Sequence, residues 1–238
     1  MIRALAAAAA VLTLAATAVA QTPPREPGKE LYAENCARCH GSTGEGIARL
    51  GPPLRGVGAG TADLYLRTGY MPLESPDDQP ERSRVLFSDR EIRALVAYVA
   101  SLGHGPPIPR PHPEHGDVAA GQRLFATHCA GCHQIAAEGG YVTGARVPPL
   151  DDVSPVQIAE AVRTGPYVMP RFSTKDVGDR ELDSLIAYVE YARHPKSSGG
   201  WALGELGPIP EGIVTWLIAA VVLVATCLVI GKRLKGGS

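Results

Sequence analysis

Two segments of the chain carry the apolar periodicity of an amphipathic helix. In each, apolar residues recur at positions i, i+3, i+4 and i+7, which places them on one helical face. They are Ile92, Leu95, Val96 and Val99 in the first segment, and Leu182, Leu185, Ile186 and Val189 in the second. Ser88 and Glu91 have the spacing of a capping box before the first segment, and Asp117 is a suitable N-cap for another helix. Shorter helices are expected from Thr61 and from Ser154.

A third apolar stretch, from Ile213 to Ile230, is continuous. Its 18 residues carry no charge and would span about 27 Å as a helix, enough to cross the hydrocarbon core of a bilayer. Lys232, Arg233 and Lys235 follow it, and positive charge favours the cytoplasmic side. The stretch is therefore predicted to be a transmembrane helix. Cys227 lies inside it, where we expect a small apolar residue without a chemical role.

The apolar stretch from Ala4 to Ala16 is shorter and rich in alanine. Arg3 precedes it, and Ala18-Val19-Ala20 has the A-x-A pattern of a cleavage site. We predict a signal peptide over residues 1–20, with a retained N-terminal anchor as the alternative. Together the two stretches predict a single-pass protein of the cell membrane whose body lies on the extracytoplasmic side.

Charge supports this layout. The formal net charge is −1, and all 24 acidic residues lie between Glu26 and Glu211. Basic residues, in contrast, also occupy both ends of the chain, next to the apolar stretches. The body is therefore net acidic, which argues against a nucleic-acid partner and leaves the membrane as the partner of the terminal bases.

The chemistry of the chain is concentrated in a five-residue motif that occurs twice. Residues 36–40 and residues 129–133 both have the pattern C-x-x-C-H, the attachment site of c-type haem. Two thiols at this spacing can form thioethers with the two vinyl groups of one porphyrin, and the next residue, His, can then bind the iron. A zinc site or a redox dithiol is the alternative for a single motif. The repetition of the whole motif, including its His, favours two covalently bound haem c groups.

The surroundings of the motifs repeat as well, which indicates an internal duplication. Gly28, Leu31, Tyr32 and Cys36 are matched by Gly121, Leu124, Phe125 and Cys129. Further along, Pro52-Pro53-Leu54 is matched by Pro148-Pro149-Leu150, and Arg67-Thr68-Gly69 by Arg163-Thr164-Gly165. The charged segment Glu74 to Arg84 has no counterpart of equal length. It is either a solvated loop or a docking surface beside the first haem.

The second axial ligand follows from the scarcity of methionine. The chain has three Met, of which Met1 initiates. Met71 and Met169 each follow a Thr-Gly pair by a few residues and directly precede a proline, which is not the setting of a methionine that fills an apolar core. We therefore predict that His40 and Met71 bind one iron, and that His133 and Met169 bind the other. His/Met ligation leaves no open iron site, which favours electron transfer.

The remaining histidines receive no role in haem binding. His104, His112, His115 and His194 lie in segments rich in proline and glycine, so we expect solvent-exposed side chains rather than metal ligands. His128, next to a motif cysteine, is expected near the haem edge.

Each repeat resembles class I cytochrome c. The resemblance implies that Gly28 and Gly121 let the aromatic residues Tyr98 and Tyr188 of the last helix cross closely. It also implies that a loop proline carbonyl holds the axial His, with Pro52 or Pro53, and Pro148 or Pro149, as candidates. The fold expected is mainly α: two tandem class I cytochrome c domains followed by one C-terminal transmembrane helix.

The order of the parts, with Gly-Pro-Ile-Pro-Glu-Gly at residues 207–212 before the span, is similar to that of the dihaem cytochrome c (cytochrome cc) subunits of actinobacterial menaquinol–cytochrome c reductases. This resemblance implies an electron-transfer subunit of a translocase without catalytic side chains of its own. It implies a cytochrome b subunit and a Rieske iron–sulfur subunit as partners. Electrons would pass from the Rieske centre through two haems c to the copper site of a cytochrome aa3 oxidase.

Other functions remain as alternatives. The chain could be a stand-alone membrane-anchored dihaem shuttle for another dehydrogenase or oxidase, although residues 207–212 weigh against this. A dihaem peroxidase needs a releasable sixth ligand, which two matched Met segments oppose. The predicted parts are a signal peptide (1–20), cytochrome c domain 1 (21–103), a linker (104–116), cytochrome c domain 2 (117–194), a linker (195–211), the transmembrane helix (212–231) and a cytoplasmic tail (232–238).

Overall fold

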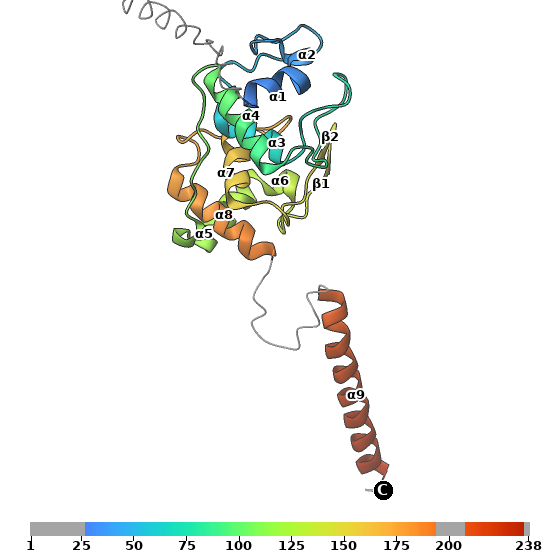
Figure 1. Ribbon diagram of the computed structural model, residues 1–238. Coiled ribbons are helices and arrows are strands. Elements are labelled where there is room, and N and C mark those ends of the chain that lie inside the picture. Colours follow the sequence, from blue (N-terminus) through green and yellow to red (C-terminus); the bar gives the residue numbers. More distant parts are fainter. Residues whose placement is uncertain (1–26, 194–207, 236–238) are drawn as a thin grey trace, which may run out of the picture. The chain divides into compact units, whose positions relative to one another are not determined.

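The computed structural model describes residues 27–193 and 208–235 (Figure 1). The predicted signal peptide, His194, most of the second linker and the last residues of the tail lie outside the described residues. Helices dominate the described part, and the only strands in it form one short hairpin. The mainly α prediction is confirmed.

The first repeat contains four helices. They are α1 (Pro27–Asn35), α2 (Ala37–His40), α3 (Gly58–Arg67) and α4 (Asp89–Ser101). The capping box predicted at Ser88 and Glu91 is confirmed, with each residue's side chain accepting from the other's backbone N–H. The four periodic apolar residues of α4 are buried and pack with Tyr32 of α1. The periodic pattern therefore marks the face that α4 turns to the core.

The helix predicted from Thr61 begins earlier, at Gly58. Its first turn has no side-chain cap. Instead the backbone N–H of Gly60 donates to the carbonyl of Pro106 at 3.1 Å. The proline-rich segment after α4 thus satisfies a backbone group that would otherwise need a cap, and the helix can begin without one.

The second repeat has the same helical order plus a hairpin. Its elements are α5 (Val118–His128), α6 (Ala130–His133), β1 (Gly140–Val142), β2 (Ala145–Val147), α7 (Pro155–Thr164) and α8 (Asp179–Arg193), preceded by the 3-10 turn Pro113–His115. Asp117 caps α5, as predicted. The helix expected from Ser154 is α7, and Ser154 caps it. The hairpin, in which Val142 pairs with Ala145, was not predicted.

Each repeat joins its third helix to the start of its last helix by an ion pair. Arg67 of α3 lies 2.7 Å from Asp89 of α4, and Arg163 of α7 lies 2.9 Å from Asp179 of α8. The two repeats meet where α3 packs against α7 (Figure 1). At this contact the hydroxyls of Thr61 and Thr164 lie 3.3 Å apart.

The last helix is α9 (Pro208–Lys235). Its segment Gly212–Arg233 has 22 residues with a mean hydropathy of 2.9. Among the described residues it is the one helix that is long and apolar enough to cross a membrane. The C-terminal apolar helix of the predicted fold is thus present and fits a single-pass membrane anchor.

Candidate haem c sites

The first motif is held by the turn that joins α1 to α2. The backbone N–H of His40 donates to the carbonyl of Cys36 at 2.9 Å, so the motif is itself one helical turn. The imidazole of His40 is buried, and its Nδ1 lies 2.7 Å from the carbonyl oxygen of Pro52. That contact fixes the ring and leaves Nε2 as the nitrogen for a metal. Of the two candidate prolines, the structure selects Pro52.

The second motif has the same local form but a different hydrogen-bond state. The N–H of His133 donates to the carbonyl of Cys129 at 2.9 Å. Its Nδ1 is buried and has no hydrogen-bond partner among the described residues. Burial lowers the pKa of His133, and the nearby Pro148 carbonyl acts in the opposite direction. Pro148 thus occupies the place that Pro52 has in the first repeat, as the proline carbonyl near the motif histidine.

The four residues predicted to hold the second haem line one cavity. Cys129, Cys132, His133 and Met169 all contribute to a space of about 330 Å³. Its walls are mainly apolar and include Phe125, Val147, Ile158, Val162 and Leu185. His128 also lines it, as expected for a residue near the haem edge, and its ring lies 5.8 Å from that of Phe172. The structure therefore brings together residues that are 40 positions apart in sequence.

In the first repeat the motif residues are gathered on α2, and Met71 follows α3. The N–H of Met71 donates to the carbonyl of Tyr65 at 3.2 Å, which ties the methionine segment to the end of that helix. Ligation of an iron by Met71 stays a prediction.

The residues present fit a haem c. An apolar cavity, two cysteines at its edge, an imidazole and a thioether are the groups that a covalently attached porphyrin requires. Burial raises the pKa of the Cys36 thiol and of the Cys129 thiol to about 11, so both are neutral at pH 7. Cys36, Cys39, His40 and Met71 would hold one haem, and Cys129, Cys132, His133 and Met169 the other.

The predicted close crossing of the first and last helices is present in both repeats. A Cβ atom placed on Gly28 would lie 3.0 Å from the Cβ of Tyr98 and would overlap the carbonyl oxygen of Ala94. A Cβ on Gly121 would lie 2.9 Å from the Cβ of Tyr188 and would overlap a backbone oxygen of α8. These positions therefore exclude any side chain, which sets the backbone separation behind each motif.

Two tyrosine hydroxyls hold the segments that follow the motifs, and sequence reasoning assigned them no such role. Tyr32 donates to the carbonyl of Gly41 at 2.7 Å, and Tyr188 donates to the carbonyl of Ile135 at 2.7 Å. Burial raises the pKa of Tyr32 to about 12, so this phenol keeps its proton. The sequence did contain a signal for this role, because both tyrosines lie where the first and last helices of their repeat cross.

A buried acid at the contact between α3 and α7 was also missed. Glu160 is fully buried, and its oxygens meet no hydrogen-bond donor among the described residues. Its pKa is raised to about 8, first by burial and then by the nearby Asp63 carboxylate, while Arg67 acts in the opposite direction. A pKa of about 8 keeps the Glu160 carboxyl mainly protonated at pH 7, close to the Asp63–Arg67 ion pair.

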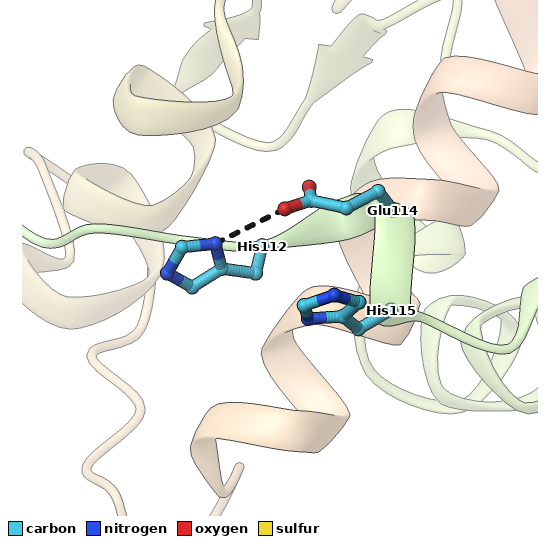
Figure 2. A group of neighbouring side chains, drawn as sticks. All are labelled: His112, Glu114 and His115. Atoms are coloured by element: carbon cyan, nitrogen blue, oxygen red, sulfur yellow. Dashed lines mark hydrogen bonds and ion pairs between the residues drawn. The ribbon is translucent and has the colours of Figure 1, made fainter.

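A further group of possible metal ligands among the described residues lies away from the haem motifs, at the 3-10 turn. Figure 2 shows His112, Glu114 and His115 side by side, all exposed. The Nδ1 of His112 lies 3.1 Å from the Glu114 carboxylate, and its backbone N–H donates to Asp183 at 2.7 Å. These contacts account for the group as a local ion pair, in line with the expected exposure of His112 and His115.

Comparison with known proteins agrees with this geometry. The family model described as cytochrome c matches residues 25–103, and the model described as cytochrome C oxidase, cbb3-type, subunit III matches residues 116–189. The cytochrome bc1 complex cytochrome c subunit of Corynebacterium diphtheriae is 36% identical over 226 residues, which cover 87% of this chain and 80% of that protein. The chain belongs to the family of cytochrome bc1 complex cytochrome c subunits.

Other relatives bear on the same point. The protein of the same name from Mycobacterium tuberculosis is 35% identical over 216 residues, covering 87% of this chain and 77% of its own length. A cbb3-type cytochrome c oxidase subunit CcoP of Azospirillum brasilense is 30% identical, but over only 68% of this chain and 60% of that protein. Both cytochrome c domains of the expected fold are thus confirmed, and with them the binding of c-type haem.

Proposed function

We propose that this chain carries electrons through two covalently attached haems c as the cytochrome c subunit of a membrane-bound quinol–cytochrome c reductase. The observation that supports it most is the cavity of the second repeat, where Cys129, Cys132, His133 and Met169 meet. When bound there, a haem supplies one-electron redox chemistry. The cysteines of each motif would attach the ring, the carbonyl of Pro52 would orient the imidazole of His40, and the apolar walls of the second cavity would keep water away.

Membership in this family supports a role as a subunit of the bc complex. The path of the electrons through that complex is our proposal. Electrons would arrive from a Rieske iron–sulfur subunit next to a cytochrome b subunit, and would leave for the copper site of an aa3-type oxidase. The translocase activity would belong to the assembled complex, in which this chain would serve as the electron-transfer subunit. The haem domains would lie on the extracytoplasmic side, since Lys232 and Arg233 at the end of α9 favour the cytoplasm.

One chain with two haem domains and an anchor has a kinetic advantage over a diffusing carrier. Two sites on one chain exchange electrons at a high effective concentration that does not depend on encounter. The contact between α3 and α7 supports this, because it joins the two repeats by side chains from both.

A second candidate is direct service to an oxidase as a stand-alone carrier. The match of residues 116–189 to a cbb3-type oxidase subunit favours it. The anchored layout suits both candidates, so the composition of the isolated complex must separate them.

The first test isolates the chain from membranes in a mild detergent by a C-terminal tag and records a reduced-minus-oxidised spectrum. Haem c together with haem b and haem a supports the complete proposal. Haem c with haem b alone supports the reductase and removes the bound oxidase. Haem c alone, on an intact chain, favours the stand-alone carrier.

A second test concerns attachment. Haem staining of a denaturing gel should show half the parent signal for Cys36→Ala/Cys39→Ala and for Cys129→Ala/Cys132→Ala. Cys227→Ala is the matched control, because this exposed thiol in α9 belongs to neither motif. Full staining of either double variant would mean that haem is not attached at that motif.

A further inference from the structure

The cavity of the second haem site is not built by the second repeat alone. Leu64 and Thr68 of the α3 region, Tyr70, and Pro80 and Arg82 of the long charged loop all line it. Each of these five residues belongs to the first repeat. Part of the wall around the second haem is therefore supplied by the neighbouring domain.

Two adjacent residues near the C-terminal end of the long charged loop anchor it to both repeats. Ser83 donates from its N–H to the carbonyl of Thr68 at 3.2 Å and from its hydroxyl to the carbonyl of Gly69 at 2.5 Å. Arg82 donates from Nη2 to the carbonyl of Asp152, in the second repeat, at 3.0 Å. The sequence suggested either a solvated loop or a docking surface beside the first haem for residues 74–84. The structure shows a mostly exposed loop, in line with a solvated loop, of which Arg82 contacts the second repeat. A docking surface beside the first haem stays a prediction.

The charges at this wall point to a ligand with carboxylates. Among the residues that line the cavity, the two guanidiniums are Arg82 and Arg146, one from each repeat. Both also line an adjoining hollow of about 140 Å³, together with Tyr70 and Glu81. The phenol of Tyr70 therefore lies in the same hollow as the charged groups of Arg82, Arg146 and Glu81.

A haem carries two vinyl groups on one part of its rim and two propionate carboxylates on another. If the vinyls are fixed at Cys129 and Cys132, the propionates must lie away from these cysteines, toward other parts of the cavity wall. Two carboxylates against apolar walls need cationic partners, and guanidinium is suited to bind a carboxylate with two parallel hydrogen bonds. Two arginines provide the matching charge.

We propose that Arg82 and Tyr70 of the first repeat, together with Arg146 of the second, hold the propionate carboxylates of the second haem. This inference rests on the proposed function, because it requires a haem in the second repeat. It has a consequence for coupling between the sites. Tyr70 directly precedes Met71, so one peptide unit would join the predicted axial ligand of the first haem to the carboxylate edge of the second.

The test is a potentiometric titration of the purified full-length protein, with Arg82→Gln compared with Arg84→Gln. Arg84 is an exposed arginine of the same loop and is not among the residues lining the cavity. A guanidinium near the haem favours the reduced state, so its loss should lower the potential of the second haem. We expect the electron-sharing equilibrium between the haems to move about tenfold toward the first, which is about 59 mV for a one-electron couple.

Arg146→Gln should give a similar shift, Tyr70→Phe a smaller one, and Arg84→Gln none. The second haem is identified as the one whose electron paramagnetic resonance signal changes in Met169→Ala. Equal potentials in Arg82→Gln and Arg84→Gln would overturn the proposal, as would a shift confined to the first haem. Haem staining separates this from the proposed function: a parent chain without haem at Cys129 and Cys132 would refute the function itself.

Discussion

In both repeats the first and the last helix cross in the same way. The tyrosine that holds the segment after the haem motif, however, comes from the first helix in one repeat and from the last helix in the other. In the first repeat the hydroxyl comes from Tyr32, on the first helix, and binds Gly41. In the second repeat Phe125 occupies the position of Tyr32, and the hydroxyl comes from Tyr188 on the last helix, which binds Ile135. The aromatic rings pair in both cases, at 4.9 Å and 5.3 Å between centroids.

The difference shows what the duplication preserved. The glycine at the crossing, the aromatic pair and the ion pair from the third to the last helix are kept because they fix the backbone around the motif. The helix that supplies the hydroxyl differs between the repeats, while in both of them the hydroxyl binds the segment after the motif. A repeat can therefore conserve a contact without conserving the residue that makes it.

The largest expected effect comes from the predicted axial methionines. Met71→Ala and Met169→Ala should each lower the potential of one haem by about 0.1 V or more, because axial ligands set much of the range of haem potentials. Each variant should also bind carbon monoxide at one iron. A redox titration and a carbon monoxide difference spectrum measure both effects.

The pair of variants also compares the repeats. If only one of them binds carbon monoxide more readily than the parent protein, the ligand assignment holds for that repeat alone. If neither does, both assignments are wrong.

The next effect concerns the crossing glycines. Gly28→Val and Gly121→Val should each destabilise their repeat by about 3 kcal/mol or more, because the new side chain overlaps backbone that cannot move without separating two packed helices. Urea unfolding followed at the haem absorption band measures the free energy of unfolding. Gly131→Val is the control, since a Cβ there meets no atom within 4 Å.

The two variants also compare the repeats. If each crossing stabilises only its own repeat, one repeat should unfold in each variant while the other keeps its haem absorption spectrum. If Gly121→Val also unfolds the first repeat, the contact between α3 and α7 couples their stabilities. Stabilities equal to that of Gly131→Val would contradict the role given to the crossing.

Part of this architecture was predictable from sequence and part was not. Periodic apolar residues gave α4 and α8, and capping residues gave the starts of α4, α5 and α7, because these signals are local. The choice of Pro52 over Pro53 needed the path of the loop. Glu160 could not be predicted to be buried, since only the packing of α3 against α7, from distant parts of the chain, removes it from water.

The buried acid gives a pH dependence to this contact between the repeats. Its folded pKa of about 8 lies above the usual value of 4.5, so the stability that it contributes is present below pH 4.5 and is lost as the pH rises through 8. Between pH 6 and pH 8 we expect the free energy of unfolding to fall by about 2 kcal/mol. Glu160→Gln should remove most of this slope, which thermal or urea unfolding at several pH values measures.

Glu114→Gln is the matched control, because this carboxyl is exposed and its pKa is lowered rather than raised. A parent protein whose stability does not fall between pH 6 and pH 8 would show that Glu160 is not neutral in the folded state.

The smallest expected effect comes from removing the tyrosine hydroxyls that bind the segment after each motif. Tyr32→Phe should cost about 1 to 2 kcal/mol in the first repeat, because it leaves the Gly41 carbonyl without its 2.7 Å donor in a buried setting. Tyr188→Phe should cost a similar or smaller amount in the second repeat, and Tyr98→Phe should cost little, although Tyr98 occupies the position equivalent to Tyr188. Unfolding followed by the absorption of each haem reports the stability of each repeat separately. Equal losses for Tyr32→Phe and Tyr98→Phe would mean that the hydroxyl's position on the crossing, rather than its bond to the motif loop, determines stability.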